Sequence, residues 1–278
     1  MKSTFRYHLW YLIICILLAL VTPGFTQEPP MRIVSTAPSV TELVCALGLR
    51  NNLVGVTTFC DRPNTVKNIS KVGGPANPSL EAIIRLKPDV VIVDEEGIGI
   101  RLSQTLTRFG IKTVVFRGAR LSKLPNAIRM LGHELGVSPK AQQLAKAIER
   151  ASEKPRTHAP AVRTLFIVWP DPLISVGSGT LINDILLKRG FEPAIVQTRA
   201  LYPHLSYEAI LRANPSLIIV GQGHTIQGPV QQMLKHIAKT DAAQSHAVCL
   251  VSDALFRPGP RIPEGIAEIE QCLTLVRK

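Results

Sequence analysis

The sequence predicts an α/β protein of two lobes, each with a mainly parallel sheet flanked by helices, and the lobes bridged by one long helix. Short apolar runs rich in β-branched residues alternate with helical segments on both sides of the middle of the chain, which is the pattern of parallel sheets. Residues 122–155 separate the two series with a long stretch of helical periodicity. An eleven-residue motif also occurs once in each half, which indicates that the two lobes are related.

The first lobe is expected to cover residues 31–121. Its strands are expected at residues 32–35, 53–57, 90–93 and 112–116, and its helices at residues 40–47, 78–86 and 103–109. The run 90–93 (VVIV) has no polar position, as expected for a strand buried on both faces of a sheet. Ser39, followed three residues later by Glu42, forms a capping box that predicts the start of the first helix.

The connecting helix is expected over residues 122–155, as one continuous helix or as a kinked pair. Its apolar pattern weakens near Gly136, and Pro139 suits the first turn of a continued helix. A polar, proline-containing link at residues 156–160 follows. The second lobe, residues 161–278, is expected to have strands at 164–168, 216–220 and 248–251 and helices at 181–188, 207–212, 230–237 and 262–275.

The repeated motif comprises residues 79–89 (SLEAIIRLKPD) and 206–216 (SYEAILRANPS), and a strand follows each copy. The copies share Ser, Glu, Ala, Ile, Arg and Pro in register. This agreement predicts pseudo-symmetric lobes in which Glu81 and Glu208 occupy equivalent places near the starts of two helices. A glutamate there also interacts favourably with the helix dipole, so its position alone does not require a partner.

Residues 1–26 have the layout of a secretory signal peptide, because Lys2 and Arg6 precede an apolar run of 13 residues, 9–21. The run is shorter than the roughly 20 residues of a spanning helix. We therefore expect export to the periplasm. An uncleaved membrane anchor is the alternative, since the segment lacks an Ala-x-Ala cleavage site. Cys15 lies inside the apolar run, which does not fit a lipoprotein signal.

The chain is basic, with a formal net charge of +12, but its Lys and Arg residues are dispersed and never form a run of five. This distribution is typical of a solvated surface and does not predict a nucleic-acid partner. Aromatic residues make up only 5% of the chain, so any binding site has few rings to draw on.

Four cysteines follow the predicted signal peptide: Cys45, Cys60, Cys249 and Cys272. In an exported chain they can form disulfides, and the three possible pairings all remain open. Cys45 lies on an apolar helical face and is expected to be a buried thiol. No CxxC or Cys/His spacing predicts a zinc site.

The sequence contains no catalytic motif of the kinds sought: GxSxG, a phosphate-binding loop, HExxH or a dinucleotide fingerprint. Residues 177–180 (GSGT) precede a helix and would suit an anion at its N-terminus, but they lack the lysine of a phosphate loop. Among the scattered histidines, His204 and His224 fall in loops where a haem or metal receptor would want a ligand. We expect no catalytic residue, no metal site and no bound cofactor.

A family resemblance rests on five segments, residues 32–49, 53–63, 72–93, 203–220 and 251–262. They follow one another in the order seen in the periplasmic binding proteins of cobalamin and iron-chelate importers. The chain resembles that family over residues 31–276, and its cobalamin-binding members most.

The resemblance implies two lobes bridged by a rigid helix, with a ligand between them. It also implies a monomeric receptor that captures cobalamin, or a related corrinoid or metal chelate, and delivers it to the permease of an ABC importer. Haem or a ferric siderophore is the alternative ligand. An enzyme and a membrane-tethered binding protein are weaker alternatives.

The resemblance further implies which residues form the site. The cleft residues are expected to be Phe59, Pro75, Asn77, Trp169, Leu173, Tyr202, Asp253, Phe256 and Arg257. The rings would form apolar walls, and Asp253 and Arg257 would bond amide groups on the ligand rim. Pro75 stands where cobalamin-binding members have a tryptophan. One exposed glutamate per lobe, Glu81 and Glu208, would dock onto arginines of the permease.

Overall fold

The computed structural model describes residues 31–153, 161–195, 200–221 and 227–276. The predicted signal peptide, the predicted link at 156–160 and His224 lie outside these ranges. Residues Met31–Lys278 belong to one compact unit, which contains both sheets. Across the described ranges, no helix has both the length and the apolarity that crossing a bilayer requires.

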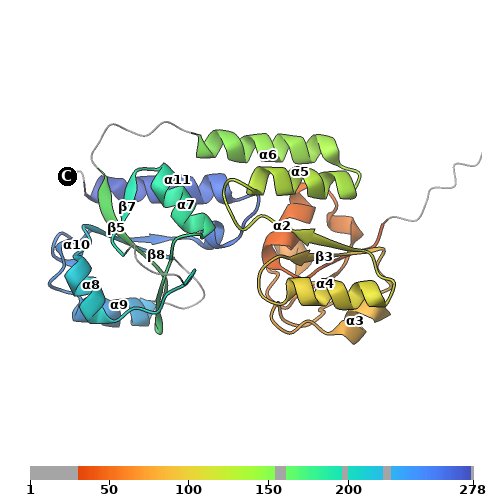
Figure 1. The fold of residues 1–278 in the computed structure, drawn as a ribbon, viewed down its shortest axis with the longest axis horizontal. Coiled ribbons are helices and arrows are strands. Elements are labelled where there is room, and N and C mark those ends of the chain that lie inside the picture. Colours follow the sequence, from red (N-terminus) through yellow and green to blue (C-terminus); the bar gives the residue numbers. More distant parts are fainter. Residues whose placement is uncertain (1–30, 154–160, 196–199, 222–226, 277–278) are drawn as a thin grey trace, which may run out of the picture. The chain divides into compact units, whose positions relative to one another are not determined.

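The sheet of the first lobe, which contains β3 in Figure 1, has four parallel strands. Their order is β2-β1-β3-β4. Its elements are β1 (Ile33–Ser35), α2 (Pro38–Ala46), β2 (Leu53–Val56), α3 (Leu80–Arg85), β3 (Val90–Asp94), α4 (Gly99–Arg108) and β4 (Thr113–Phe116), with 3₁₀ turns at Arg50–Asn52 and Asn64–Val66. Leu106 of α4 belongs to the apolar cluster on one face of the sheet with Val91, while Leu43 of α2 belongs to the cluster on the other face with Ile92. The predicted strands of this lobe are confirmed, with small shifts at their ends.

The sheet of the second lobe has the order β6-β5-β8-β9, and β7 also pairs with β5. Its elements are β5 (Val162–Pro170), β6 (Leu173–Ser175), α7 (Leu181–Lys188), β7 (Phe191–Pro193), α8 (Tyr207–Ala213), β8 (Leu217–Gly221), α9 (Gln227–His236), α10 (Asp241–Gln244), β9 (Val248–Val251) and α11 (Ile262–Cys272), with 3₁₀ turns at Asp253–Phe256 and Leu273–Leu275. Only β6 runs antiparallel to its neighbour. The fold class predicted for the two lobes is confirmed, and β6, β7 and α10 are elements that the prediction did not include.

The connecting segment folds as two helices, as the predicted alternative of a helix pair has it, and not as one continuous helix; the pair forms a hairpin instead of a kink. These are α5 (Leu124–Glu134) and α6 (Ser138–Ser152), which lie side by side (Figure 1). Gly136 adopts a left-handed φ of 71°, and the N–H of Val137 donates to the carbonyl of Gly132 at 2.7 Å, which closes the end of α5.

The two helices of this hairpin pack closely. A Cβ atom placed on Gly132 would stand 2.1 Å from the Cβ of Ala141, so only glycine fits there. Arg129 of α5 also bonds Glu149 of α6 at 2.8 Å. Helix α6 then packs on α11. Arg189, the residue that follows α7, donates to the carbonyl of Ala151 near the end of α6. The bridge to the second lobe is therefore α6 alone, about 22 Å long at 1.5 Å per residue.

The repeated motif forms the same structure in both lobes. The Ser79 and Ser206 hydroxyls accept hydrogen bonds from the backbone N–H three residues on, at 3.1 and 3.2 Å, and so cap α3 and α8. After each helix one residue takes a left-handed conformation, Lys87 at φ 45° and Asn214 at φ 41°. The predicted pseudo-symmetry of this unit is confirmed down to its backbone bend.

The predicted capping box at Ser39 is wrong. Helix α2 begins at Pro38, two residues before the expected start at residue 40. Its N-cap is Ala37, which makes no side-chain cap. Proline is favoured at the first helical position because its fixed φ suits the helix. Ser39 therefore lies inside the first turn, where its hydroxyl donates to Asp94 at 3.2 Å, and Glu42 is free to bond elsewhere.

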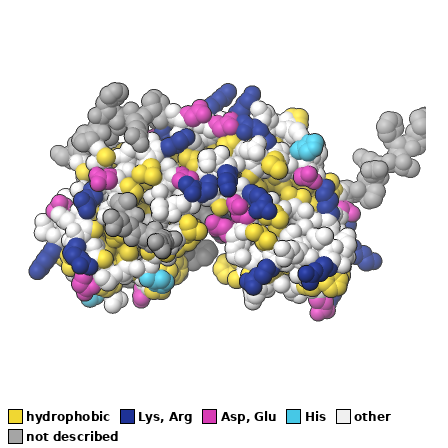
Figure 2. All heavy atoms as spheres, viewed as in Figure 1, with side chains coloured by type: hydrophobic (Ala, Val, Ile, Leu, Met, Phe, Trp, Pro, Cys, Tyr) yellow, Lys and Arg dark blue, Asp and Glu magenta, His cyan; other side chains and the backbone are white. Residues whose placement is uncertain are grey.

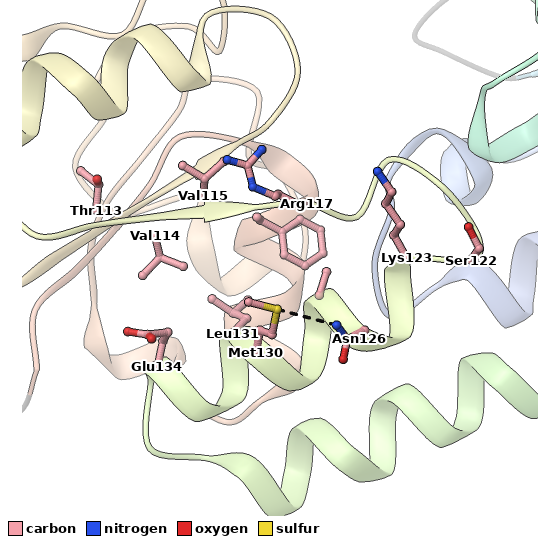
Figure 3. A pocket seen from close by; sticks show the side chains of 12 residues that line it. Thr113, Val114, Val115, Arg117, Ser122, Lys123, Asn126, Met130, Leu131 and Glu134 are labelled. Atoms are coloured by element: carbon pink, nitrogen blue, oxygen red, sulfur yellow. Dashed lines mark hydrogen bonds between the residues drawn. The ribbon is translucent and has the colours of Figure 1, made fainter.

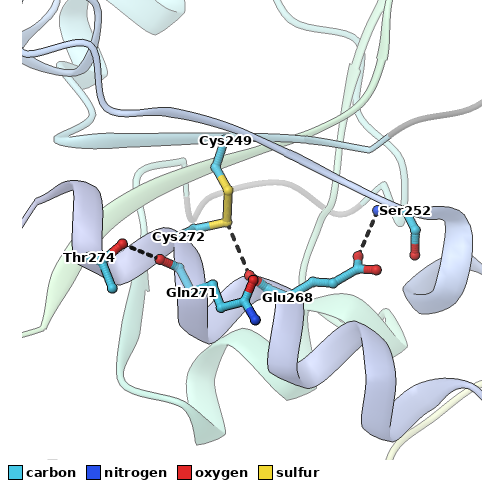
Figure 4. Close-up of a disulfide and its surroundings, with 6 residues drawn as sticks. All are labelled: Cys249, Ser252, Glu268, Gln271, Cys272 and Thr274. Atoms are coloured by element: carbon cyan, nitrogen blue, oxygen red, sulfur yellow. Dashed lines mark hydrogen bonds between the residues drawn. A yellow bond between two sulfur atoms is a disulfide. The ribbon is translucent and has the colours of Figure 1, made fainter.

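One disulfide joins Cys249 of β9 to Cys272 at the end of α11 (Figure 4). Cys45 and Cys60 are free thiols, so this pairing answers the question that the sequence left open. Cys60 is buried, and its sulfur forms a hydrogen bond with the Thr57 hydroxyl at 3.1 Å. Cys45 is half-buried, and burial raises the pKa of its thiol to about 11, so this thiol is protonated at neutral pH.

The charged side chains are spread over the surface. Figure 2 shows Lys and Arg side chains at both ends and in the middle of one face, with Asp and Glu side chains among them. This mixed distribution agrees with the dispersed pattern of basic residues along the sequence.

Candidate ligand-binding cleft

Three consecutive carboxylates follow the central strand of the first lobe. Strand β3 ends at Asp94, and Glu95 and Glu96 come directly after it. Open α/β sheets bind ligands outside the carboxyl ends of their strands, which is where these side chains lie. A pocket of about 310 Å³ opens at this edge, and its lining includes Asp94, Glu96, Thr36 and Pro75.

The charges of this group are largely uncompensated. Burial raises the pKa of Asp94, although it accepts hydrogen bonds from the Glu96 N–H at 3.1 Å and from Ser39. Burial and the negative charges of Asp94 and Glu95 raise the pKa of Glu96. Within the described ranges only Glu95 has a cationic neighbour, Arg117, at 4.0 Å. Asp94 and Glu96 therefore present negative charge to whatever enters the pocket.

Tyr202 of the second lobe lies within electrostatic range of this acidic edge. Burial and the charges of Glu96 and Asp94 raise the pKa of Tyr202 to about 12. Its ring keeps 43% of its surface exposed, so the side chain lines an open space and does not belong to a core. The described lining of the 310 Å³ pocket comes from the first lobe, and Tyr202 is a second-lobe residue whose pKa responds to the carboxylates of that pocket.

Other apolar side chains of the predicted cleft are exposed. Phe59 of the first lobe is 62% exposed and lies beside Gly74, and Trp169 is exposed near the end of β5. Leu201, next to Tyr202, is also exposed and approaches Gly179. Phe59, Trp169 and Tyr202 were predicted from the sequence as cleft residues, and Leu201 was not.

The remaining loop positions of the first lobe are also accessible. Pro75 and Asn77 are exposed in the turn before α3, where the Asn77 N–H donates to the carbonyl of Gly74 at 3.2 Å. The acidic edge at Asp94 was not among the predicted site residues. Its position directly after an uninterrupted apolar strand was the signal that could have found it.

Of two further predicted cleft residues, one is buried and one is partly exposed. Leu173 is buried in the core of the second lobe. Phe256 is partly exposed and packs edge-on against Phe166, with ring centroids 5.9 Å apart. Its ring also covers Gly221, where a Cβ would come within 2.0 Å of it. Leu173 is therefore a core residue, whereas Phe256 keeps part of its side chain accessible.

Asp253 and Arg257, predicted to bond the ligand, take part in an ion-pair network between the lobes. Arg257 bonds Glu42 at 2.8 Å and Asp61 at 2.7 Å, both in the first lobe, and Asp253 at 2.9 Å. Arg261 bonds Glu42 through two nitrogens, at 2.8 and 3.1 Å, and Asp253 at 2.9 Å. We call these five residues the junction network.

The junction network is well shielded from water. Glu42 is only 4% exposed and receives both arginines, so its charge is fully paired. Partial burial alone would raise the pKa of Asp61, but the hydrogen bond and charge of Arg257 outweigh it and lower the pKa. A second contact between the lobes is the bidentate pair of Arg120 and Asp184, at 2.8 and 2.7 Å.

The two glutamates predicted to dock on a permease are both exposed in the first turn of their helices. Glu81 bonds Arg85 on its own helix at 2.5 Å. Hydrogen bonds from its own backbone N–H and from Ser206 hold the pKa of Glu208 low, and Arg212 adds to this. Both carboxylates are therefore accessible and lie at equivalent positions in the two lobes.

The described part of the chain holds no group of three or more His, Cys, Asp or Glu side chains placed to bind a metal ion. His204 is exposed beside β6, where it forms an isolated bridge with Ile174.

Most of the chain, residues 33–249, matches the family described as periplasmic binding protein. An uncharacterized ABC transporter substrate-binding lipoprotein of Bacillus subtilis, YvrC, is 30% identical over 89% of this chain and 81% of its own length. The vitamin B12-binding protein of Salmonella paratyphi A is 30% identical over 88% of this chain and 90% of its own length.

A solved structure shows the same fold. The periplasmic vitamin B12 binding protein BtuF of Vibrio cholerae superposes with a TM-score of 0.76 at 24% sequence identity, over 90% of this chain and 99% of the other.

Proposed function

Because this chain belongs to the periplasmic binding protein family, we propose that it captures a small-molecule chelate in the periplasm and hands it to an ABC permease. We further propose that the ligand is cobalamin or a related corrinoid. The similarity to a vitamin B12-binding protein over 88% of the chain supports this ligand class. Export through cleavage of residues 1–26 and action as a monomer are parts of the same proposal.

The observation that carries the proposal is the pocket of about 310 Å³ lined by Asp94 and Glu96, whose charges also raise the pKa of Tyr202 of the other lobe. A corrin has two apolar faces and a rim of amide groups. The exposed rings of Phe59 and Trp169 suit the faces. The carboxylates suit the rim, because an ionised oxygen accepts strong hydrogen bonds from amide N–H groups.

The same charges favour a corrinoid over haem. The rim of haem carries two carboxylates, which would meet Asp94 and Glu96 without an intervening cation. Like charges placed opposite each other in a partly buried site are repulsive and suppress the wrong partner. Arg257, the cation that the sequence suggested for the ligand rim, is already bonded to three carboxylates.

Delivery would use the two glutamates of the repeated motif. Glu81 and Glu208 are exposed and occupy equivalent positions on α3 and α8. Two carboxylates on two lobes offer a permease two separate anchoring points for arginines. The protein does no chemistry in this scheme and acts as a receptor, not as an enzyme.

A binding experiment tests the ligand. Purified protein without residues 1–26 is mixed in turn with cyanocobalamin, haemin and ferrichrome, and binding is followed by absorbance and calorimetry. We expect submicromolar binding of cyanocobalamin and at least tenfold weaker binding of haemin. Tight binding of haemin or ferrichrome alone would replace the corrinoid, and binding of none of the three would refute the ligand proposal.

A further inference from the structure

A second pocket, of about 630 Å³, lies in the first lobe between strand β4 and helix α5 (Figure 3). None of the cleft residues lines it. Its floor is apolar and includes Val114, Phe116 and Leu131. Its volume is within the range of specific binding pockets. The cleft proposal gives this groove no role.

Strand β4 is the outer strand of its sheet and has one free edge. The Glu95 N–H donates to the carbonyl of Phe116, at 3.0 Å, so alternate residues of β4 direct their backbone groups toward β3. Thr113 and Val115, between them, direct N–H and C=O to the outside. Within the described ranges these four groups have no hydrogen-bond partner. An unpaired edge is a template for another strand.

Helix α5 forms the opposite wall of the groove. Lys123, Met130 and Glu134 follow one another along this side in Figure 3. Ala127 also lines the pocket, four residues after Lys123 and three before Met130. Met130 is 62% exposed, although it is a large apolar side chain. The row is about 16 Å long and β4 about 13 Å. An extended segment of four or five residues matches that length.

The charges at the two ends of the groove differ. At one end Glu134 is paired with Lys112 at 2.9 Å, so that end is neutral. At the other end stand Arg117 and Lys123. Arg117 has only a distant ion pair with Glu95, and Lys123 has no ion pair within the described ranges. The groove therefore offers unpaired donors along one side, apolar contacts along its length and positive charge at one end.

We propose that this groove binds an extended peptide segment of a partner protein, which adds to β4 as a fifth strand of the sheet. Its backbone pairs with the outward groups of Thr113 and Val115, and its alternate apolar side chains lie against Met130. A carboxylate of the peptide lies next to Arg117 and Lys123. Backbone pairing supplies affinity, while the groove and the charge select the sequence.

The test begins with a phage-displayed heptapeptide library selected on the purified protein, with the Val115→Pro variant used for counter-selection. Proline at 115 removes an outward N–H that the sheet itself does not use, so an edge strand tolerates it. We expect peptides with alternating apolar residues and an acidic residue at one end. A library that yields no peptide preferring the parent protein over Val115→Pro would overturn the proposal.

A selected peptide, labelled with fluorescein, is then titrated by fluorescence polarisation. Val115→Pro should weaken binding at least tenfold, whereas Val115→Ala, which loses the same side chain but keeps the N–H, should weaken it less than threefold. Met130→Glu and Lys123→Glu should each weaken it severalfold, and Lys235→Glu, on exposed α9, should leave it unchanged. Equal binding to the Pro and Ala variants would overturn strand addition.

Two further measurements separate the alternatives. If Val115→Pro fails to fold by circular dichroism, the peptide methylated on alternate backbone nitrogens replaces it, with the same expected loss. If ultracentrifugation shows a dimer that Val115→Pro abolishes while no peptide binds, the occupant is a second copy of this chain and the proposal is wrong. Cyanocobalamin binding should be unchanged in all these variants, so the groove and the cleft fail or succeed separately.

Discussion

The carboxylates at the lobe junction and those at the cleft differ in whether an arginine pairs with them. Glu42 and Asp61 lie where the lobes meet and are each bonded to arginine. Asp94 and Glu96 line a pocket at the end of β3 and have no cationic partner within the described ranges. Paired buried charges hold a structure in register, whereas unpaired ones are retained at a cost in stability and are therefore candidates for function.

The largest effect is expected from the junction. Replacement Glu42→Gln removes the more deeply buried of the two carboxylates that Arg257 and Arg261 share, the other being Asp253. Removing one partner of a buried ion pair typically costs about 3–5 kcal/mol. We expect a loss of that size in the free energy of unfolding, measured with urea. The exposed Glu264→Gln change on α11 is the control and should alter it by less than about 0.5 kcal/mol. A small effect at Glu42 would mean that the junction is not a structural contact.

The cleft should show the reverse pattern, with binding lost and the fold retained. The double change Asp94→Asn with Glu96→Gln keeps shape but removes both charges. Hydrogen bonds to a charged acceptor are stronger than those to a neutral one, so cyanocobalamin affinity should fall roughly tenfold, about 1.4 kcal/mol. Calorimetry measures it, with Glu264→Gln as the unaffected control. Unchanged affinity would remove these carboxylates from the ligand site.

The same substitution, Asp to Asn, should change the free energy of unfolding in opposite directions at the junction and at the cleft. The pKa of Asp61 is lowered in the folded protein, so its contribution to stability is present above its ordinary pKa near 3.9 and is lost as the pH falls through the folded value. Asp61→Asn should therefore destabilise by about 1 kcal/mol at pH 7, and the difference should shrink below pH 4.

The pKa of Asp94 is raised, so its charge destabilises the fold at neutral pH and this penalty disappears as the pH falls through the raised value. Asp94→Asn should stabilise by up to about 1 kcal/mol at pH 7. Urea unfolding at pH 7, 5 and 3 measures both variants. If both variants changed the free energy of unfolding in the same direction at pH 7, the two sets of carboxylates would not differ in the way proposed.

The smallest effect on the folded protein is expected from the exposed glutamates. The double change Glu81→Ala with Glu208→Ala should leave the unfolding transition and cyanocobalamin affinity unchanged, because both side chains extend into solvent. Uptake of labelled cyanocobalamin by cells that depend on this protein should nevertheless be lost. Normal uptake with normal binding would refute the docking role, and Glu264→Ala is the matched control.

Local patterns predicted most of the fold. Uninterrupted apolar runs such as residues 90–93 predicted the parallel strands, and the repeated motif predicted the equivalence of α3 and α8. The hairpin was missed because Gly136 and Pro139 suit a kinked helix as well as a tight turn. What decides between them is the contact of Gly132 with Ala141, which only the folded chain makes.

The site was harder to predict, because its contacts join distant parts of the chain. Arg257 meets Glu42 across 215 positions, and nothing near either residue indicates the other. The same holds for the choice among the cysteine pairings. Exposed rings such as Phe59 were found from resemblance. The charges of Asp94 and Glu96 gain their meaning only from Tyr202 on the other lobe.

The bond between Cys249 and Cys272 also records where a given molecule has been. The cytosol keeps thiols reduced, and the bond forms only in an oxidising compartment. Under the proposed export, a molecule retained before cleavage keeps Cys15 and would carry five alkylatable thiols after unfolding, whereas an exported and cleaved one would carry only Cys45 and Cys60. Counting alkylated cysteines by mass thus dates each molecule relative to its passage across the membrane.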